Sequence, residues 1–260
     1  GEKVINSIQP FKYSDPSKVS SYNYKPKQNY KKPHFLRDVQ NLCKKNNIVF
    51  IVDETITGFR WHFKGACHRY NVKPDLVIFG KAIANGFSLA VLAGNKKFMS
   101  LGSIDKPNQE RVFLLSSTHG GEMSSLGAAS KTIDMLQDGK KIQKIWSHGV
   151  KIINGINCIS RELGLLDNIF LYGLPCSPYL VTNIDQKNSP KLRTYLQEEL
   201  IKYKIMMPYI SISASHTDKE AKYLISSFQK ILPKLKKFIK NRQNKKKFKN
   251  IIKPVFRKYN

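Results

Sequence analysis

The sequence predicts an α/β protein that contains part of a large sheet domain and a small carboxyl-terminal α/β domain. Two short apolar runs, at 48–52 and 76–79, are each bounded by polar residues, which is the pattern of strands buried on both faces. Segments with apolar residues at helical spacing precede and follow these runs. Such a mixture of buried strands and amphipathic helices is typical of helices packed on a sheet.

The same criteria place the remaining elements along the chain. Continuous apolar runs indicate strands, three-to-four-residue spacing indicates helices, and Gly139 separates two helices. The expected elements are a strand at 4–8, a helix around 35–43, strands at 48–52, 76–79 and 89–93, helices at 123–136 and 141–163, strands at 169–172, 179–181 and 210–213, and helices at 191–203 and 218–240.

A chain of 260 residues is long enough for two cores. We expect the carboxyl-terminal part of the large domain at 1–122, the small domain at 123–240 and a basic tail at 241–260. The chain begins with Gly1 rather than methionine, so we expect either that the chain was processed or that its true beginning is missing.

The net charge of +27 raises the question of an anionic partner. Thirteen Lys and Arg residues, and no acidic residue, lie between Lys230 and Asn260. No helix-turn-helix, zinc finger or aromatic RNA-binding strand accompanies this charge, so a nucleic-acid partner is not expected. A tail that binds anionic partners stays open as an alternative.

Cysteine spacing and hydropathy constrain the cellular location of the protein. The four cysteines are scattered without a CxxC pair, which favours reduced thiols and a cytoplasmic protein. No apolar run approaches the ~20 residues that span a bilayer, so a membrane partner is not expected. His62, Cys67 and His68 have no known metal-ligand spacing, and packing or surface roles are the expectation for them; no metal is predicted.

Two residues that could carry chemistry follow buried strands, 28 positions apart. Asp53 comes after the run 48–52, and Lys81 follows the run 76–79 through Gly80. Ligands of open α/β sheets bind at the carboxyl ends of the strands. A carboxylate and an amine at that edge suit pyridoxal 5′-phosphate, which has a basic ring nitrogen and an aldehyde. A strand-ending acid and a solvent-exposed lysine are the alternative interpretation.

A third candidate is Thr118, in the polar turn before the helix expected at 123–136. Its hydroxyl and the amides of the turn could bind a phosphate, because helix amino termini attract anions. An ordinary helix cap by a hydroxyl residue is the alternative for this segment taken alone.

Three blocks in this order resemble the signatures of class III pyridoxal-phosphate-dependent aminotransferases, with glutamate-1-semialdehyde 2,1-aminomutase and its relatives as the nearest branch. The blocks are Asp-Glu-Thr-Ile-Thr-Gly-Phe-Arg at 53–60, Pro-Asp-Leu-Val-Ile-Phe-Gly-Lys at 74–81 and Ser-Ser-Thr-His-Gly-Gly-Glu at 116–122. The segment Ile-Ser-Ile-Ser-Ala-Ser-His-Thr-Asp at 210–218 is similar to the one that opens the last helix of that family. The likeness extends over about 35–240.

The resemblance implies fold type I, a homodimer with shared active sites, and an amine or carbonyl substrate. It implies that Lys81 holds pyridoxal 5′-phosphate as a Schiff base and that Asp53 pairs with the ring nitrogen. It also implies that Thr118 reaches the cofactor phosphate of the neighbouring subunit. Thr55 stands where the family has valine beside the ring, and we expect it to contact the cofactor.

The resemblance therefore predicts an aminotransferase or aminomutase that moves an amino group between an amine and a carbonyl. The family's Ser-Gly-rich phosphate loop and ring-stacking aromatic residue are absent upstream of Asp53. By this comparison we expect the chain to lack the amino-terminal half of the enzyme. A catalytically incomplete fragment and a basic non-enzymatic binding module therefore stay open as alternatives, and so does another reaction on the same scaffold.

Overall fold

The structure is a computed structural model, and it describes residues 35–103, 105–106, 108, 120–241 and 248–253. Its contacts divide the chain into two units after Gln143, and we describe each unit by itself. Helix α5 (Met123–Leu136) packs on the first unit, and the domain boundary expected after residue 122 stays a prediction. The strand expected at 4–8, Thr118 and most of the basic tail lie outside the described residues.

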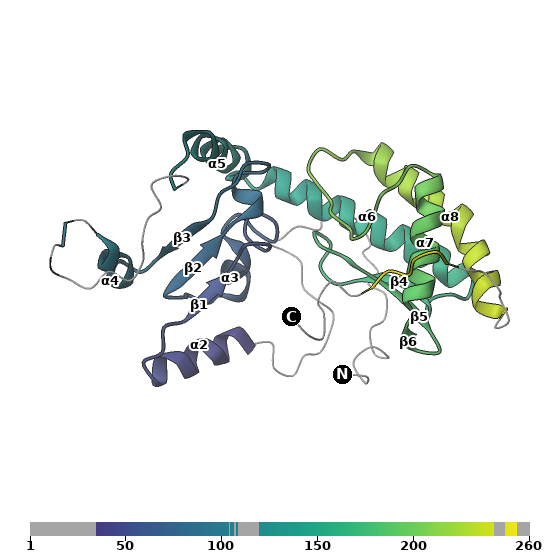
Figure 1. The fold of residues 1–260 in the computed structure, drawn as a ribbon, viewed down its shortest axis with the longest axis horizontal. Coiled ribbons are helices and arrows are strands. Elements are labelled where there is room, and N and C mark those ends of the chain that lie inside the picture. Colours follow the sequence, from purple (N-terminus) through teal and green to yellow (C-terminus); the bar gives the residue numbers. More distant parts are fainter. Residues whose placement is uncertain (1–34, 104, 107, 109–119, 242–247, 254–260) are drawn as a thin grey trace. The chain divides into compact units, whose positions relative to one another are not determined.

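The first unit is built on a three-stranded sheet in the order β1-β2-β3 (Figure 1). Strand β1 runs parallel to β2, with Asp53 opposite Ile78, and β3 is antiparallel to β2. The strands are short because polar turns follow each apolar run. Their bounds are Ile51–Asp53, Leu76–Phe79 and Val91–Gly94, which confirms three of the predicted strands with β1 shorter than expected.

The helices of this unit bury its apolar side chains in two clusters. One joins Phe50, Cys67 and Val72 to the apolar side of helix α2. The other joins Ile83 and Ala84 to Ala129 of helix α5. The helical elements are α2 (Phe35–Lys45), α3 (Gly65–Tyr70), the 3-10 turn η2 (Lys81–Ile83), α4 (Lys96–Met99), the 3-10 turn η3 (Ser100–Gly102) and α5 (Met123–Leu136).

The second unit has a three-stranded antiparallel sheet in the order β4-β5-β6, with bounds Ile169–Tyr172, Tyr179–Ile184 and Lys187–Asn188. Helix α6 (Lys140–Glu162) contacts the outer edge of this sheet through Asn157. The Asn157 side chain donates to the Leu171 carbonyl at 2.8 Å and accepts from the Leu171 amide at 2.7 Å. A buried side chain thus satisfies backbone groups of β4 that no described strand pairs.

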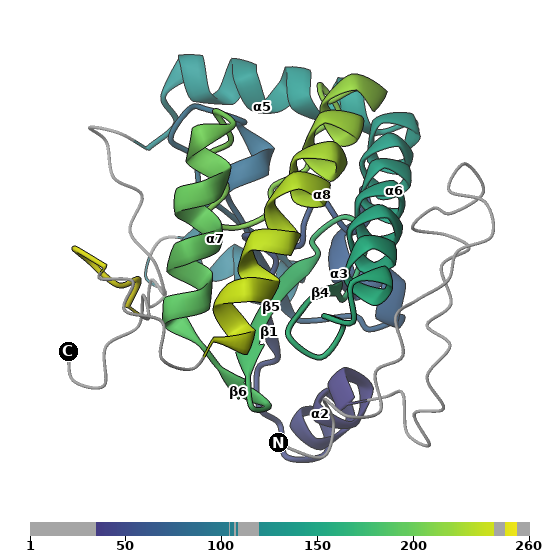
Figure 2. The same ribbon diagram turned by 90° about the vertical axis from the view of Figure 1, so that its right-hand side faces the viewer.

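Helices α7 (Pro190–Lys202) and α8 (Asp218–Lys240) lie side by side in the second unit (Figure 2). Ser189 caps α7, and Thr217 forms a capping box with Glu220 at the start of α8. Buried Glu199 of α7 pairs with Lys202 and, at 2.8 Å, with Lys234 of α8. The fully buried side chains of this core include Trp146, Ile153, Ile156, Ile169, Leu171, Leu192, Leu196, Leu200, Phe228 and Ile231.

Helices α5, α6, α7 and α8 confirm the sequence prediction, but the strand predicted at 210–213 is wrong. Ile210 and Ile212 are buried, as an alternating strand pattern requires, yet this segment has no strand partner in the described part of the chain. Side chains of α7 bond to the adjoining backbone instead. Arg193 donates to the Pro208 carbonyl at 2.8 Å, and Gln197 donates to that of Met207.

No helix among the described residues is both long and apolar enough to cross a membrane.

Candidate functional site

Asp53 and Lys81 lie at the same end of two neighbouring strands. Asp53 is the last residue of β1, and Lys81 is the second residue after β2 ends at Phe79. Because β1 and β2 are parallel, both residues are at the carboxyl end of the sheet, as predicted. This is the edge where ligands of open α/β sheets bind.

The carboxylate of Asp53 is held in its ionised form. The Thr55 backbone amide donates to its Oδ1 at 2.8 Å. Hydrogen bonds from the Thr55 side chain and backbone lower the pKa of Asp53, and the positive charge of Lys81 lowers it further. The Lys81 charge is the smallest of these contributions, and the Thr55 hydrogen bonds are the largest.

Lys81 is exposed and begins the 3-10 turn η2 with a positive φ of 44°. A positive φ is uncommon outside glycine and is costly unless the surrounding structure enforces it. Ile83 and Ala84, which follow directly, are buried against Ala129 and so hold the turn in place. The lysine amine is thus presented to solvent from a rigidly anchored turn.

Thr55 connects the two strand ends. It donates to Asp53 through its amide, and its methyl group lies over Gly80, directly before Lys81. A Cβ added at Gly80 would lie 3.0 Å from the Thr55 Cγ2, a close contact that shows how tightly the two residues approach. The predicted contact of Thr55 with a cofactor is compatible with this position between Asp53 and Lys81.

The next acidic residue, Glu54, has a structural role that the sequence analysis missed. Its side chain is 1% exposed and accepts hydrogen bonds from the backbone amides of Ala66 at 2.9 Å and Cys67 at 2.7 Å. The Thr57 hydroxyl donates to the same carboxylate. Glu54 therefore satisfies amides in the first turn of α3, where a negative charge also meets the positive end of the helix.

Gly65 makes room for this buried carboxylate. It has a positive φ of 74°, and a Cβ added to it would lie 2.5 Å from the Glu54 carboxyl carbon. Side chains alternate along a strand, so Glu54 points into the unit while its neighbour Asp53 stays exposed. Alternation indicates that one of two adjacent acids points inward, but the partners of Glu54 become evident only from its contacts with α3.

The structure brings together three of the four predicted site residues, namely Asp53, Thr55 and Lys81. Thr118 lies outside the described residues, so its predicted role stays a prediction. The rings of His62 and His68 stack with centroids 4.0 Å apart, and burial, followed by the charge of His68, lowers the pKa of His62 to about 4. Within the described ranges, no group of three or more His, Cys, Asp or Glu is placed to hold a metal ion.

An ionised carboxylate and an exposed lysine on one sheet edge can act on a flat ligand from two directions. The carboxylate would keep a basic ring nitrogen protonated, because opposite charges at short range favour the charged form of both groups. The lysine, once neutral, is a nucleophile for an aldehyde and a carrier of protons. Asp53, Thr55 and Lys81 therefore fit pyridoxal 5′-phosphate.

Solved structures share this fold. A structure of the FumI protein of Sphingopyxis sp. MTA144, in its PLP internal aldimine form, superposes with a TM-score of 0.70 and 17% sequence identity over 80% of this chain and 48% of that one. A transaminase with PLP bound superposes with a TM-score of 0.69 and 20% identity over 80% and 49% of the two chains. These similarities confirm the predicted α/β fold of PLP-dependent transaminases.

Two curated proteins are similar to this chain in sequence. The 3-aminobutyryl-CoA aminotransferase of Cloacimonas acidaminovorans is 32% identical over 80% of this chain and 49% of its own length. The glutamate-1-semialdehyde 2,1-aminomutase of Nitrosopumilus maritimus is 26% identical over 78% of this chain and 50% of its own length. The chain therefore spans about half the length of the curated relatives it matches.

The profile of the family described as aminotransferase class-III matches residues 28–232, a range that contains both strands of the site and both of its charged residues. Together with the relatives and the shared fold, this match covers most of the sequence, and the chain belongs to the class III aminotransferase family.

Proposed function

We propose that this protein is a pyridoxal-phosphate-dependent aminotransferase or aminomutase, which moves an amino group between a small amine and a small carbonyl compound. The family match indicates pyridoxal 5′-phosphate as the cofactor. When bound, the cofactor supplies an electron sink for the charge that is released at the substrate Cα. The observation that carries the proposal is the placement of Asp53 and Lys81 at the carboxyl ends of parallel strands β1 and β2.

In this proposal Asp53 is the partner of the cofactor's ring nitrogen. The Thr55 hydrogen bonds and the Lys81 charge, which keep the pKa of Asp53 low, support this role because only an ionised carboxylate can stabilise a protonated ring. Thr55 keeps the carboxylate oriented and contacts the cofactor.

Lys81 is proposed to bind the cofactor aldehyde and to carry the proton at the substrate Cα. Its exposed amine and its anchored turn support both tasks, since the amine must reach two successive partners from a fixed base. Gly80 and Ala82, on either side, add little bulk near the amine.

The finer parts of the proposal follow from the family. They are a homodimer with shared active sites, a cytoplasmic location, and a Thr118 hydroxyl that binds the cofactor phosphate of the neighbouring subunit. Domains at 1–122, 123–240 and a tail at 241–260 belong to the same proposal. The two curated relatives differ in reaction, so the proposal names the shared step, transfer of an amino group, rather than one substrate.

Reductive trapping tests the proposal on the 260-residue chain. The protein is incubated with sub-stoichiometric pyridoxal 5′-phosphate, treated with borohydride and mapped by peptide mass spectrometry. Many lysines are exposed, so the modified fraction at each site is the readout. We expect Lys81 to dominate, its adduct to vanish in Lys81→Ala, and the matched variant Lys97→Ala, an exposed lysine of the same unit, to keep it.

The outcomes separate the alternatives. Preferential modification of Lys81 together with amino transfer from an amine donor supports the full proposal. Modification without turnover would support a catalytically incomplete fragment instead. Uniform modification of the surface lysines, combined with a salt-sensitive complex with a polyanion, would replace the proposal by a basic binding module.

A further inference from the structure

A cavity of about 860 Å³ lies in the second unit. Its walls come from helix α6, from the segment between α7 and α8, and from the first turns of α8. Neither Asp53, Thr55 nor Lys81 lines it. The volume is within the ~300–1,000 Å³ that is usual for small-molecule sites. The residues to which we assign roles in amino transfer therefore leave this cavity without an assigned function.

The wall is largely apolar, and much of it is open to solvent. The segment before α8 contributes Met206, whose exposed fraction is 86%, and Tyr209, which is also exposed. Apolar side chains that form a contiguous exposed patch with a polar rim often mark a binding groove. Ile152, Ile205, Met207, Ile210, Ile212 and Leu224 complete the apolar lining.

The charged residues of the lining are mostly positive. Lys204, Lys219 and Lys222 are exposed cations on its wall. The acidic residue among them, Glu220, is engaged in the capping box, where it accepts from the Thr217 amide at 2.7 Å and the Thr217 hydroxyl at 2.6 Å. These hydrogen bonds lower the pKa of Glu220 to about 2. The cavity therefore combines an apolar wall with unbalanced positive charge.

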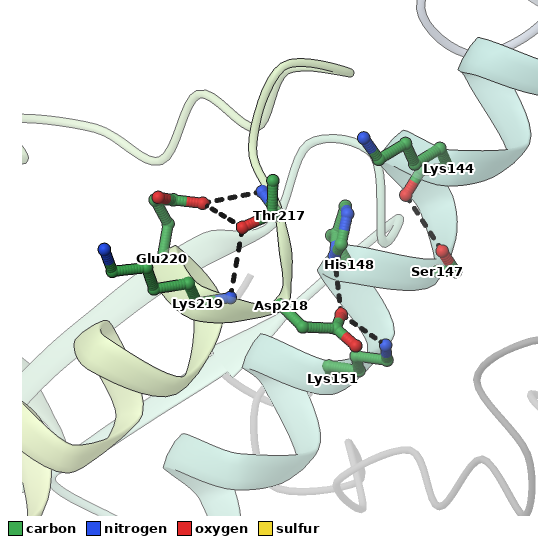
Figure 3. A network of polar contacts seen from close by, with 8 residues as sticks. All are labelled: Lys144, Ser147, His148, Lys151, Thr217, Asp218, Lys219 and Glu220. Atoms are coloured by element: carbon green, nitrogen blue, oxygen red, sulfur yellow. Dashed lines mark hydrogen bonds and ion pairs between the residues drawn. The ribbon is translucent and has the colours of Figure 1, made fainter.

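Among the polar side chains in the wall, His148 of α6 is the most deeply buried, with 5% of its surface exposed. Figure 3 shows it beside Asp218 and Lys151. Among the described residues, neither of its ring nitrogens has a hydrogen-bond partner. The Asp218 carboxylate lies 3.6 Å from its Nδ1, which is too far for a hydrogen bond, and that carboxylate is bound at 2.6 Å by Lys151. A buried imidazole without partners is costly, and a ligand that bonds to it would remove the cost.

We propose that this cavity binds a small carboxylate with an apolar body, such as an aliphatic or aryl-substituted acid. The apolar body packs on the wall formed by Met207, Ile210 and Ile212. The carboxylate accepts the ring N–H of His148 and is attracted by Lys219 and Lys222. A neutral apolar ligand would satisfy only the first of these contacts, and a short, fully polar anion only the second.

Calorimetric titration with decanoate, below the concentration at which it forms micelles, tests this proposal on the 260-residue chain. Decanol serves as the uncharged counterpart. We expect decanoate to bind at one site and decanol at least about tenfold more weakly. Ring 15N chemical shifts of His148 should change on addition of decanoate, whereas those of His68, which lies outside the cavity, should stay constant.

Variants locate the site. His148→Phe keeps an aromatic side chain but removes the donor, and the double variant Lys219→Gln/Lys222→Gln removes only exposed charge. Each should weaken decanoate about tenfold while leaving decanol unchanged. The matched control, Lys230→Gln/Lys237→Gln, removes the same charge from another part of α8 and should bind decanoate as the unmodified chain does. The exposed-lysine variant keeps the test valid if His148→Phe fails to fold.

Three results would overturn the proposal. One is equal weakening by the two lysine pairs, which would mean attraction by the overall charge of +27. Another is an unchanged His148 spectrum with saturating decanoate. The third is a chain that self-associates and excludes decanoate from the cavity, which would identify it as an interface between copies. None of these results depends on whether Lys81 binds a cofactor.

Discussion

The buried carboxylate of Glu54 lies directly against Gly65, eleven residues further along the chain. A Cβ on Gly65 would lie 2.5 Å from the carboxyl carbon, and the carboxylate bonds the two amides that follow this glycine, those of Ala66 and Cys67. Because Glu54 directly follows Asp53, the last residue of β1, its contact with α3 holds the end of β1 in position. The position of Asp53, the exposed residue predicted to bind the cofactor, thus depends on its inward-pointing neighbour Glu54.

The first prediction concerns the space at Gly65. Gly65→Ala should lower the free energy of unfolding by about 2–4 kcal/mol, because it adds a steric clash with Glu54 to the backbone cost of a positive φ. Denaturant titration measures this change. Gly121→Ala is the matched control, since Gly121 has φ 79° and nothing within 4 Å of the added Cβ; it should cost only about 1 kcal/mol. Equal losses in the two variants would contradict the close contact.

The second prediction concerns the charge of Asp53. Asp53→Asn keeps the size of the side chain but removes its negative charge, so the affinity for pyridoxal 5′-phosphate should fall about tenfold or more. Fluorescence titration of the chain with the cofactor measures this affinity. Asp134→Asn, an equal charge change at an exposed position of α5, should leave it unchanged. If both variants bind the cofactor as tightly as the unmodified chain, Asp53 is not its partner.

The third prediction concerns the pH dependence that Thr55 sets. Thr55→Val, the residue usual in the family, removes the hydroxyl but keeps the backbone amide that donates to Asp53. The pKa of Asp53 should therefore rise toward its ordinary value without reaching it. As the pH falls, Asp53 would become protonated at a higher pH than in the unmodified chain, and cofactor binding would be lost earlier. Cofactor titrations across the acidic range compare the two proteins; coincident curves would contradict this role.

The sequence predicted the long helices and the paired strands because their apolar periodicity is local. Helix α8 begins directly after its capping residue Thr217, and β2 and β4 follow the apolar runs residue by residue. The juxtaposition of Asp53 with Lys81 was predictable because both follow strands that must be parallel in this fold. Predicting these features requires only local sequence patterns and the rule that these two neighbouring strands of such a sheet run parallel.

The features that the sequence analysis missed depend on contacts between distant segments. In the sequence, Glu54 looks like a second acid at the end of a strand. Its structural role becomes evident only from the hydrogen bonds that the α3 amides donate to it. The segment 210–213 has strand periodicity, but side chains of α7 satisfy its neighbouring backbone. The environment of His148 needs three elements to be assembled before the cavity exists. No local pattern contains this information.

The fourth prediction concerns Asn157, whose side chain replaces a neighbouring strand along β4. Asn157→Leu should lower the free energy of unfolding by about 2–4 kcal/mol, because it leaves both the amide and the carbonyl of Leu171 buried without a partner. Thermal and denaturant unfolding measure the loss. The matched control, Gln143→Leu, places the same residue at an exposed position of the same helix and should change stability by less than about 0.5 kcal/mol. Equal stabilities would show that Leu171 finds other partners.

The fifth prediction concerns the order in which the cysteines react. Burial, and then the Glu54 carboxylate, raise the pKa of Cys67 to about 12, so this thiol should be inert to a thiol-specific reagent until the chain unfolds. Cys158 is exposed, and its thiol donates to the Glu162 carboxylate at 3.3 Å, which raises its pKa and slows its reaction. Glu162→Gln should therefore speed the labelling of Cys158 and leave Cys67 unreactive, as time-resolved mass spectrometry can measure. Rapid labelling of Cys67 in the native chain would mean that the Glu54–α3 contact opens readily, and with it the support beneath Asp53.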